Sequence, residues 1–365
     1  MEPVAKKLKV LSNCCKSIYD YKKKKLVSPS LPTLLWIEPT NKCNLKCIMC
    51  PNTNIPENDI GFMTWDTYKK IIDEAREFVS STYLLIGGES LLHKNIYDMI
   101  RYARDNGIRP LLNTNGTLLV SQENRTKLLD SGVVHITFAF DGYNKETYES
   151  VRIGAKYDAV LKGIIEFLKE KKHRNLKEPF IAITTLEVGI ERYGDKEKER
   201  MSFYKLFDGL PVDEFILKTP NTWGGTFSGT SQFHHHEISE SKYQPCSHLW
   251  STMSICWDGT VVPCCFDFFK TYVLGNIHEK SLKEIWNDKP MVNLRKGMID
   301  GTYAQINKLC TGCVILHLTT IAGIPAGMRT TVKDSLTNIF GIRYEKTFKR
   351  IAKILNPSYS LKVEK

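Results

Sequence analysis

The chain has 365 residues, of which 25% are charged and 42% are hydrophobic. These values are ordinary for a folded globular protein, and the length allows a large core with a smaller added unit. No run approaches the roughly 18 apolar residues of a membrane span, and the N-terminus lacks a signal-peptide core, so we expect a cytoplasmic protein. Eleven cysteines in that compartment indicate metal or redox chemistry rather than a disulfide framework.

The net charge of +11 is concentrated at the two ends of the chain. Residues 1–26 carry eight lysines against two acidic residues, and residues 329–365 carry nine Lys or Arg against three. Because the body between them is close to neutral, we expect no nucleic-acid partner. For the basic tail over residues 326–365, two interpretations stay open. It is either a solvated helix packed on the protein or a peripheral contact with an anionic membrane, at its inner surface.

The first 30 residues are predicted to form a basic, helical segment. From there to Pro220, short apolar runs alternate with helical patterns, as in buried parallel strands joined by helices. The predicted strands are Leu34–Glu38, Tyr83–Ile86, Pro110–Asn113, His135–Phe140, Phe180–Leu186 and Glu214–Leu217.

Three helices of this region have recognisable starts. Thr64 with Thr67 opens one that runs toward Phe78, Ser121 caps a second, and 144–172 holds a longer amphipathic stretch. Six such strand–helix units predict an α/β fold, either a barrel, partial or full, or a doubly wound sheet, with function at the carboxyl ends of the strands. After Pro220 a loop rich in Gly and His leads to a cysteine-bearing segment, which indicates a second, smaller unit.

Three cysteines directly follow the first predicted strand. Cys43, Cys47 and Cys50 have the spacing C-x3-C-x2-C. Three thiolates on one loop can hold three irons of a [4Fe–4S] cluster and leave the fourth iron open for a chelating cofactor. The alternative is zinc, which prefers four protein ligands in structural sites.

This loop resembles the signature of the radical S-adenosylmethionine (SAM) superfamily, with Met49 as the apolar residue before the last cysteine. The resemblance implies a partial (β/α)6 TIM-like barrel over residues 31–225, and it continues at the next strand ends. Gly87, Gly88 and Glu89 match the family's GGE turn for the SAM amine, although Ser90 replaces the usual proline. Further expected SAM contacts are Asn115 in a TNG segment, Asp141 in an S-x-D-G segment whose serine is Ala139 here, and Arg152 for the SAM carboxylate.

A second group of cysteines resembles the SPASM domain of this superfamily. Cys246, Gly259 and Cys264 follow the pattern C-x12-G-x4-C, and Cys310 and Cys313 supply a later C-x2-C pair. The resemblance implies a small C-terminal cluster-binding domain over residues 226–325, of the shortened "twitch" type. Cys246, Cys264, Cys310 and Cys313 would then hold a second, fully coordinated [4Fe–4S] cluster, with zinc as the alternative.

The remaining cysteines, Cys14, Cys15, Cys256 and Cys265, have no ligand role in these patterns, and buried cysteines are usually small apolar residues. Related sugar epimerases use a cysteine as hydrogen-atom donor, so Cys265 and, after it, Cys256 are the catalytic candidates. Cys265 is preferred because it stands beside the ligand Cys264. It is not expected to be a ligand itself, because adjacent side chains of an extended segment point to opposite faces, so it would face the substrate. His234–His236 is interpreted as a polar loop near the substrate rather than a metal site, and Trp223 as lining the active site or anchoring the core.

The resemblance implies that the first cluster, reduced by a flavodoxin or ferredoxin, cleaves SAM to a 5′-deoxyadenosyl radical that abstracts hydrogen from the substrate. Only 42 residues precede Cys43, so we expect no leader-peptide recognition domain. We therefore favour a small-molecule or glycan substrate: a sugar, aminocyclitol or lipid-linked glycan that is oxidised or epimerised. The alternatives are radical modification of a peptide and a non-catalytic iron–sulfur electron carrier, which would not need the GGE turn.

Overall fold

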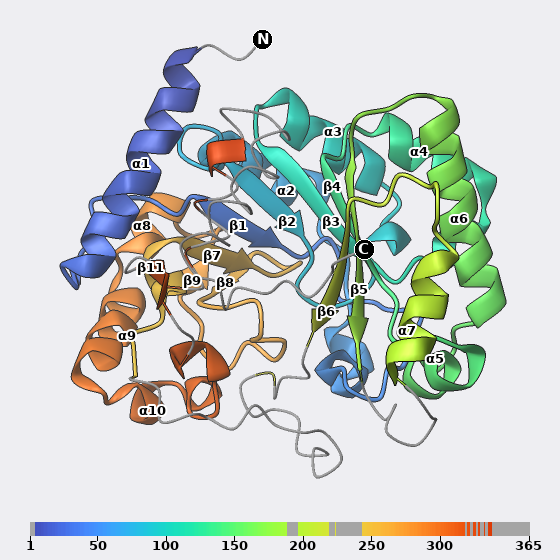
Figure 1. The fold of residues 1–365 in the computed structure, drawn as a ribbon. Coiled ribbons are helices and arrows are strands. Elements are labelled where there is room, and N and C mark those ends of the chain that lie inside the picture. Colours follow the sequence, from blue (N-terminus) through green and yellow to red (C-terminus); the bar gives the residue numbers. More distant parts are fainter. Residues whose placement is uncertain are drawn as a thin grey trace.

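Six parallel strands form the centre of this computed structural model, which describes residues 4–187, 196–218, 223, 243–317, 320–321, 324–325, 328, 332 and 335–337. The strands lie in the order β6-β5-β4-β3-β2-β1, as successive strand–helix units require, and Figure 1 shows them curving into an open barrel. The predicted partial barrel is thus confirmed. The bounds are β1 Leu34–Ile37, β2 Ser81–Leu84, β3 Arg109–Thr114, β4 His135–Ala139, β5 Phe180–Leu186 and β6 Glu214–Lys218.

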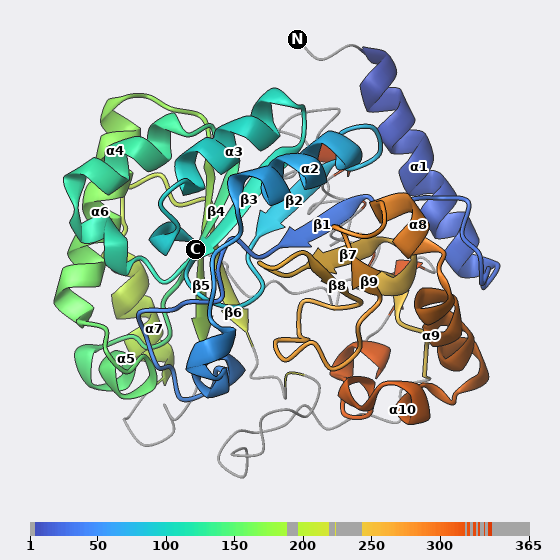
Figure 2. The ribbon, with the colours of Figure 1, turned by 180° about the vertical axis from the view of Figure 1, so that it is seen from behind.

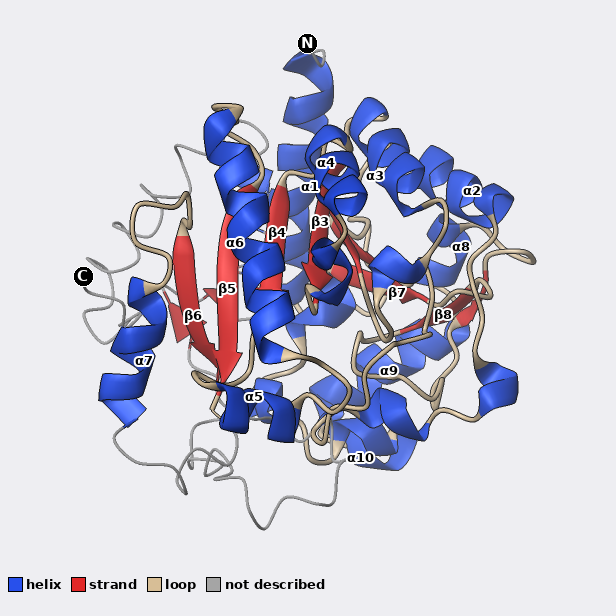
Figure 3. Cartoon of the chain, turned by 90° about the vertical axis from the view of Figure 1, so that its right-hand side faces the viewer, coloured by secondary structure: helices blue, strands red, loops and turns tan. Residues whose placement is uncertain are grey.

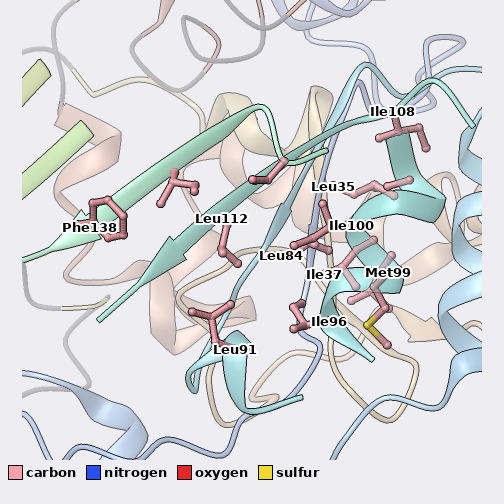
Figure 4. Close-up of a cluster of buried hydrophobic side chains, with 14 of the residues drawn as sticks. Leu35, Ile37, Leu84, Leu91, Ile96, Met99, Ile100, Ile108, Leu112 and Phe138 are labelled. Carbon is pink, nitrogen blue, oxygen red and sulfur yellow. The ribbon is translucent and has the colours of Figure 1, made fainter. Parts of the chain in front are cut away.

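Helices cover the outer face of this sheet, as seen from behind in Figure 2. They are α2 Trp65–Ala75, α3 Ile96–Asp105, α4 Gln122–Asp130, α5 Lys145–Val151, α6 Tyr157–His173 and α7 Lys196–Lys205. Alternate residues of the strands point to this face, and Figure 4 shows Ile37 and Leu84 near apolar side chains of α3. Phe138 of β4 packs on Phe167 of α6. This layer is the main core of the barrel.

The predicted helix starts are confirmed at two positions, because the Thr64 side chain accepts the N–H of Thr67 and the Ser121 side chain accepts that of Asn124. The amphipathic stretch predicted over 144–172 is helical but not continuous. The structure has two helices, α5 and α6, separated at Arg152–Lys156, where Gly154 adopts a positive φ of 97°. This break turns the chain so that Arg152 at the end of α5 lies near Cys47.

The cysteine-bearing unit continues the barrel sheet on the far side of β1. Strand β7 (Thr252–Ile255) pairs in parallel with β1, and β8 (Thr260–Val262) and β9 (Gly275–Asn276) follow antiparallel. Helices α8 (Leu282–Trp286), α9 (Lys289–Asp300) and α10 (Tyr303–Ile306) complete the unit, which lies beside the barrel in Figure 3. The short strands β10 (Thr320–Ile321) and β11 (Ile324–Pro325) form a separate pair.

Helix α1 (Val4–Lys22) lies along the edge of the molecule next to this unit (Figures 1 and 2). Its inner face is fixed by polar contacts: the Ser17 hydroxyl donates to the carbonyl of Trp250, and the Asn13 amide donates to those of Leu31 and Phe78. Among the described residues, no helix is both long and apolar enough to cross a membrane. The His234–His236 loop and all of the predicted basic tail except 328, 332 and 335–337 lie outside the described residues.

Candidate active site and auxiliary cluster site

The three-cysteine loop leaves the carboxyl end of β1 and folds back over the strand ends. Cys47 is buried, and Cys43 and Cys50 are half-buried. Burial raises the pKa of the Cys43 thiol to about 11 and that of Cys50 to about 12. Since only the thiolate binds iron, cluster assembly here must displace protons from these thiols.

The GGE turn after β2 rests directly on the backbone of the cysteine loop. Gly88 has φ +69°, and a Cβ atom there would lie 2.4 Å from the carbonyl oxygen of Thr40 and 2.7 Å from that of Lys42. The N–H of Glu89 donates to the same Lys42 carbonyl at 2.8 Å. Only glycine fits this contact, which fixes the turn against the three thiols.

The Glu89 carboxylate links the ends of β2 and β3. It is 2% exposed and accepts hydrogen bonds from the Thr114 hydroxyl at 2.8 Å and from the N–H of Asn115 at 2.7 Å and of Leu91 at 3.2 Å. A carboxylate offers about four acceptor positions, so one remains for a cationic amine. Burial raises the pKa of Glu89, while these three hydrogen bonds favour its charged form.

A buried ion pair lies across the site from Glu89. The Arg152 guanidinium donates to one oxygen of Asp141 at 2.5 Å, and the other oxygen accepts the N–H of Leu186 at the end of β5. The Nε of Arg152 is buried and has no hydrogen-bond partner among the described residues. Because buried donors are normally satisfied, this orphaned N–H fits a bound carboxylate. Glu89 for an amine and Arg152 for a carboxylate are the complementary groups that the amino-acid part of SAM needs.

The other expected SAM contacts lie at the same edge. Asn115 donates to the Asn44 side chain in the cysteine loop and accepts hydrogen bonds from Thr117. Met49 is buried, and its carbonyl accepts the indole N–H of Trp223 at 2.9 Å. The structure therefore brings the three thiols, the GGE turn, Asn115, Asp141 and Arg152 together at the carboxyl ends of β1 to β4.

The second cysteine set surrounds one small, largely apolar cavity in the auxiliary unit. Its walls include Leu249, Leu294, Met298 and Phe266, together with Cys246, Cys264, Cys310 and Cys313. Burial, and then the neighbouring thiols Cys313 and Cys264, raise the pKa of Cys246. His248 also lines the cavity and forms a hydrogen bond with the Cys264 thiol.

Four thiols around a cavity fit a cluster of four irons. Within the described residues, no group of three or more His, Cys, Asp or Glu side chains is arranged to hold a single metal ion. Zinc would require thiolates that converge to about 2.3 Å from one point. The four cysteines would hold such a cluster with one ligand for each iron, and the apolar walls would keep water away from it.

The reasoning from alternating side chains at Cys264 and Cys265 is wrong. Strand β8 ends at Val262, so both residues lie outside a strand, and the Cys265 thiol contacts the Cys264 thiol instead of pointing to the opposite side. Cys265 also lies near Lys218 at the end of β6. It thus stands between the auxiliary cavity and the inner face of the barrel. Cys256 is 3% exposed and packs with Ile86, Val262 and Trp36.

Three residues of this region were missed in the sequence. Lys218 ends β6 beside Leu186 of β5, near Asp141, Arg152 and Cys265. Glu38 and Asn52 hold the N–H groups of Gly87 and Gly88. The position of Lys218 at a strand end was a usable signal, whereas the contacts of Glu38 and Asn52 join loops far apart in the sequence.

Comparison with known proteins agrees with this geometry. The model of the radical SAM superfamily matches residues 37–201, and that of an iron–sulfur cluster-binding domain, SPASM, matches residues 246–314. The chain belongs to the radical SAM superfamily. Within it, the chain is an enzyme with a SPASM-type auxiliary domain, and its cofactors are [4Fe–4S] clusters and SAM.

Individual relatives differ in what they do. An AdoMet-dependent heme synthase of Methanosarcina barkeri is 35% identical over 134 residues, 36% of this chain and 38% of that protein, so the chain matches well under half of that relative. A tungsten-containing aldehyde ferredoxin oxidoreductase cofactor-modifying protein of Pyrococcus furiosus is 26% identical over 298 residues, 70% and 81% of the two chains. The structure of Streptococcus suis SuiB bound to precursor peptide SuiA shares the fold, with a TM-score of 0.59 at 16% identity over 84% of this chain and 75% of SuiB.

The two cysteine sets predict separate iron contents. Anaerobically reconstituted protein should hold about eight irons, and replacing Cys43, Cys47 and Cys50 together with Ala should leave about four and abolish SAM cleavage. Replacing Cys310 and Cys313 should also leave about four, whereas Cys265→Ala should keep about eight. Iron and sulfide analysis checks this; a Cys265 variant that loses a cluster while a Cys264 variant keeps it would reverse the ligand assignment.

The Glu89 carboxylate should contribute directly to SAM affinity. Glu89→Gln removes a charge-assisted contact of about 1.5–3 kcal/mol, so the Kd for SAM should rise roughly 10- to 100-fold with both clusters retained. Equilibrium dialysis measures the Kd, with Glu123→Gln on the exposed start of α4 as the control. Unchanged affinity would mean that Glu89 serves only its three protein contacts.

Proposed function

We propose that this radical SAM enzyme oxidises or epimerises a polyhydroxylated small molecule: a sugar, an aminocyclitol or a lipid-linked glycan. The observation that carries the proposal is a set of polar side chains that stand among aromatic ones on the inner face of the barrel, together with Lys218 and Cys265 near its SAM-binding edge. A peptide-modifying activity, the alternative, calls for an open groove rather than a set of single hydrogen-bonding groups.

The inner face is built from the strand residues that alternate with the apolar core. Strand register places Ser254, Trp36 and Tyr83 in one row, and Asn113 beside Thr137 in the next strands. Two of these side chains, Ser254 through Oγ and Asn113 through Oδ1, have buried polar atoms without a partner among the described residues. Unsatisfied acceptors and donors of this kind suit a ligand with several hydroxyl groups.

Lys218 supplies a charge at the mouth of this face. The side chain of Lys218 reaches solvent. Protein atoms packed around it on the inner face of the sheet nevertheless displace part of its water, which lowers the pKa of its ammonium group. Asp141, the carboxylate whose charge acts on Lys218, is already paired with Arg152. Lys218 is therefore placed to bind an oxygen of the substrate, hydroxyl or phosphate, between the SAM site and Cys265.

When bound, the first cluster and SAM supply a 5′-deoxyadenosyl radical, for which a flavodoxin or ferredoxin provides the electron. The residues of the chain bind and orient SAM and protect the reacting atoms. Glu89 and Arg152 hold the two ends of the amino-acid group, and the buried strand ends exclude water from the reacting atoms.

Cys265 decides between the two outcomes. In epimerisation its S–H bond breaks as a C–H bond forms on the substrate, and one electron and one proton must then restore the thiol. In oxidation the substrate loses an electron and a proton instead, and the four-cysteine site adjoining Cys265 is the place for an electron acceptor. The contact between Cys265 and Cys264 supports either route.

Solvent deuterium distinguishes these outcomes. In deuterated buffer with SAM, reductant and candidate sugars or aminocyclitols, epimerisation should put one deuterium into the product, because the Cys265 thiol exchanges with solvent. Oxidation should give an unlabelled product two hydrogens lighter. Cys265→Ala should abolish the labelled product, and the exposed Cys15 serves as a matched control. Mass spectrometry reads the result, and turnover of peptides alone would overturn the proposal.

We further propose a peripheral contact with an anionic membrane, made by the outer face of α1. Leu8 and Tyr19 on this face are 57% and 54% exposed, and Val27 after the helix is 60% exposed. Exposed lysines flank them: Lys9, Lys16, Lys22 and Lys23. An apolar strip bordered by lysines is typical of a helix that lies in a lipid interface, with the ammonium groups reaching the head groups.

Removing this face should lower vesicle binding and leave SAM cleavage intact. Changing the four flanking lysines to Gln should weaken binding to vesicles of anionic lipid at low salt roughly 1,000-fold, since each lysine contributes about 1 kcal/mol and about 1.4 kcal/mol is tenfold. The control changes four exposed lysines elsewhere, Lys94, Lys162, Lys205 and Lys308. Sedimentation with vesicles measures the binding of both variants. An equal loss of vesicle binding in both would mean that overall charge, and not the outer face of α1, causes the binding.

A further inference from the structure

Glu38 occupies the junction between the SAM site and the auxiliary unit. It directly follows β1, the strand that lies between β2 and β7 in the sheet, and only 3% of it is exposed. Its own N–H donates to the carbonyl of Ile255, which extends the pairing of β1 with β7 by one residue. The side chain therefore stands where the GGE turn after β2 meets the turn between β7 and β8.

Each oxygen of the Glu38 carboxylate holds a different turn. Oε1 accepts the N–H of Gly87 at 3.0 Å, and Oε2 accepts that of Trp257 at 3.2 Å. Burial raises the pKa of Glu38, whereas the two N–H groups and the nearby Lys270 favour the charged form. A glutamine cannot replace it, because its single carbonyl oxygen serves one N–H and its amide nitrogen faces the other.

A second route connects the same two turns through Trp257. Its indole N–H donates to the carbonyl of Asp59, and its ring covers Gly61, where a Cβ atom would lie 2.4 Å from ring carbons. Asn41 accepts the N–H of Gly61 and donates to the Asp59 carbonyl. Asn52 then donates to the carbonyl of Asn41 and accepts the N–H of Gly88 at 3.1 Å.

Both glycines of the SAM-binding turn are thus tied to Trp257 of the auxiliary unit, Gly87 through Glu38 and Gly88 through Asn52. We propose that Glu38 is a positioning residue that couples SAM binding to the folding of the auxiliary unit. The coupling is reciprocal: an ordered auxiliary unit tightens SAM binding, and bound SAM stabilises the auxiliary unit by the same factor. It requires no particular substrate and so stands apart from the proposed reaction.

The test compares four reconstituted proteins: wild type, Glu38→Gln, Cys310→Ala with Cys313→Ala, and the combination. Glu38→Gln should raise the Kd for SAM roughly 10-fold while keeping about eight irons, and the cysteine variant should raise it by a similar factor. The combination should be no weaker than the cysteine variant, because loss of an ordered auxiliary unit already removes the connection that Glu38 makes. Glu279→Gln, an exposed carboxylate of the same unit, should match wild type.

The electron paramagnetic resonance signal of the reduced first cluster gives an independent measure of SAM binding. Its change on adding SAM should require about ten times more SAM in Glu38→Gln, at unchanged iron content. An unaltered Kd, or effects of the two changes that multiply in the combination, would overturn the proposal. Should Glu38→Gln fail to fold, hydrogen exchange of the wild-type amides of Trp257 and Gly259 decides: SAM should slow it, and equal rates with and without SAM refute the coupling.

Discussion

The parallel pairing of β1 with two neighbours, β2 and β7, is the constraint on which both sites depend. Because carboxyl ends of parallel strands meet at one edge, this pairing places the cysteine loop, the GGE turn and the auxiliary hairpin side by side. Gly88 then sets the distance between the cysteine loop and the GGE turn, because a residue without a side chain lets the backbones of these two segments touch. The side chains of Glu38 and Asn52 lie against the same turn and accept the N–H groups of Gly87 and Gly88.

Much of this arrangement could be predicted from residue order. Strands recur where β-branched and apolar runs end in Gly, Asn or Asp, so the edge that carries the thiols, Glu89 and Asp141 follows from the chain itself. Even there, β2 lies two residues earlier than predicted, because Leu85 and Ile86 are apolar but already belong to the turn. The resemblance singled out Arg152, whereas its ion pair with Asp141 depends on the break at Gly154, which a helical pattern does not reveal.

Contacts between loops that are far apart in the sequence could not be predicted from residue order. The alternation argument for Cys264 and Cys265 assumed an extended strand, and the chain instead turns at Pro263. Glu38 reads as one more strand residue, and its partners, Gly87 and Trp257, are 49 and 219 positions away. Tertiary hydrogen bonds of this kind leave no local pattern, so they become visible only when the turns are placed in space.

Strand β7 is synthesised long after its partner β1, and this order affects how the protein folds during synthesis. Strand β1 spans Leu34–Ile37, but the partner for its outer edge begins at Thr252. A nascent chain that has emerged through β6 therefore holds a nearly complete barrel with one edge of β1 still open. Open strand edges recruit other chains, so ribosome-bound intermediates of this length are the stage most exposed to aggregation. The auxiliary hairpin ends that exposure, which makes it a closing strand for biosynthesis as well as a carrier of iron.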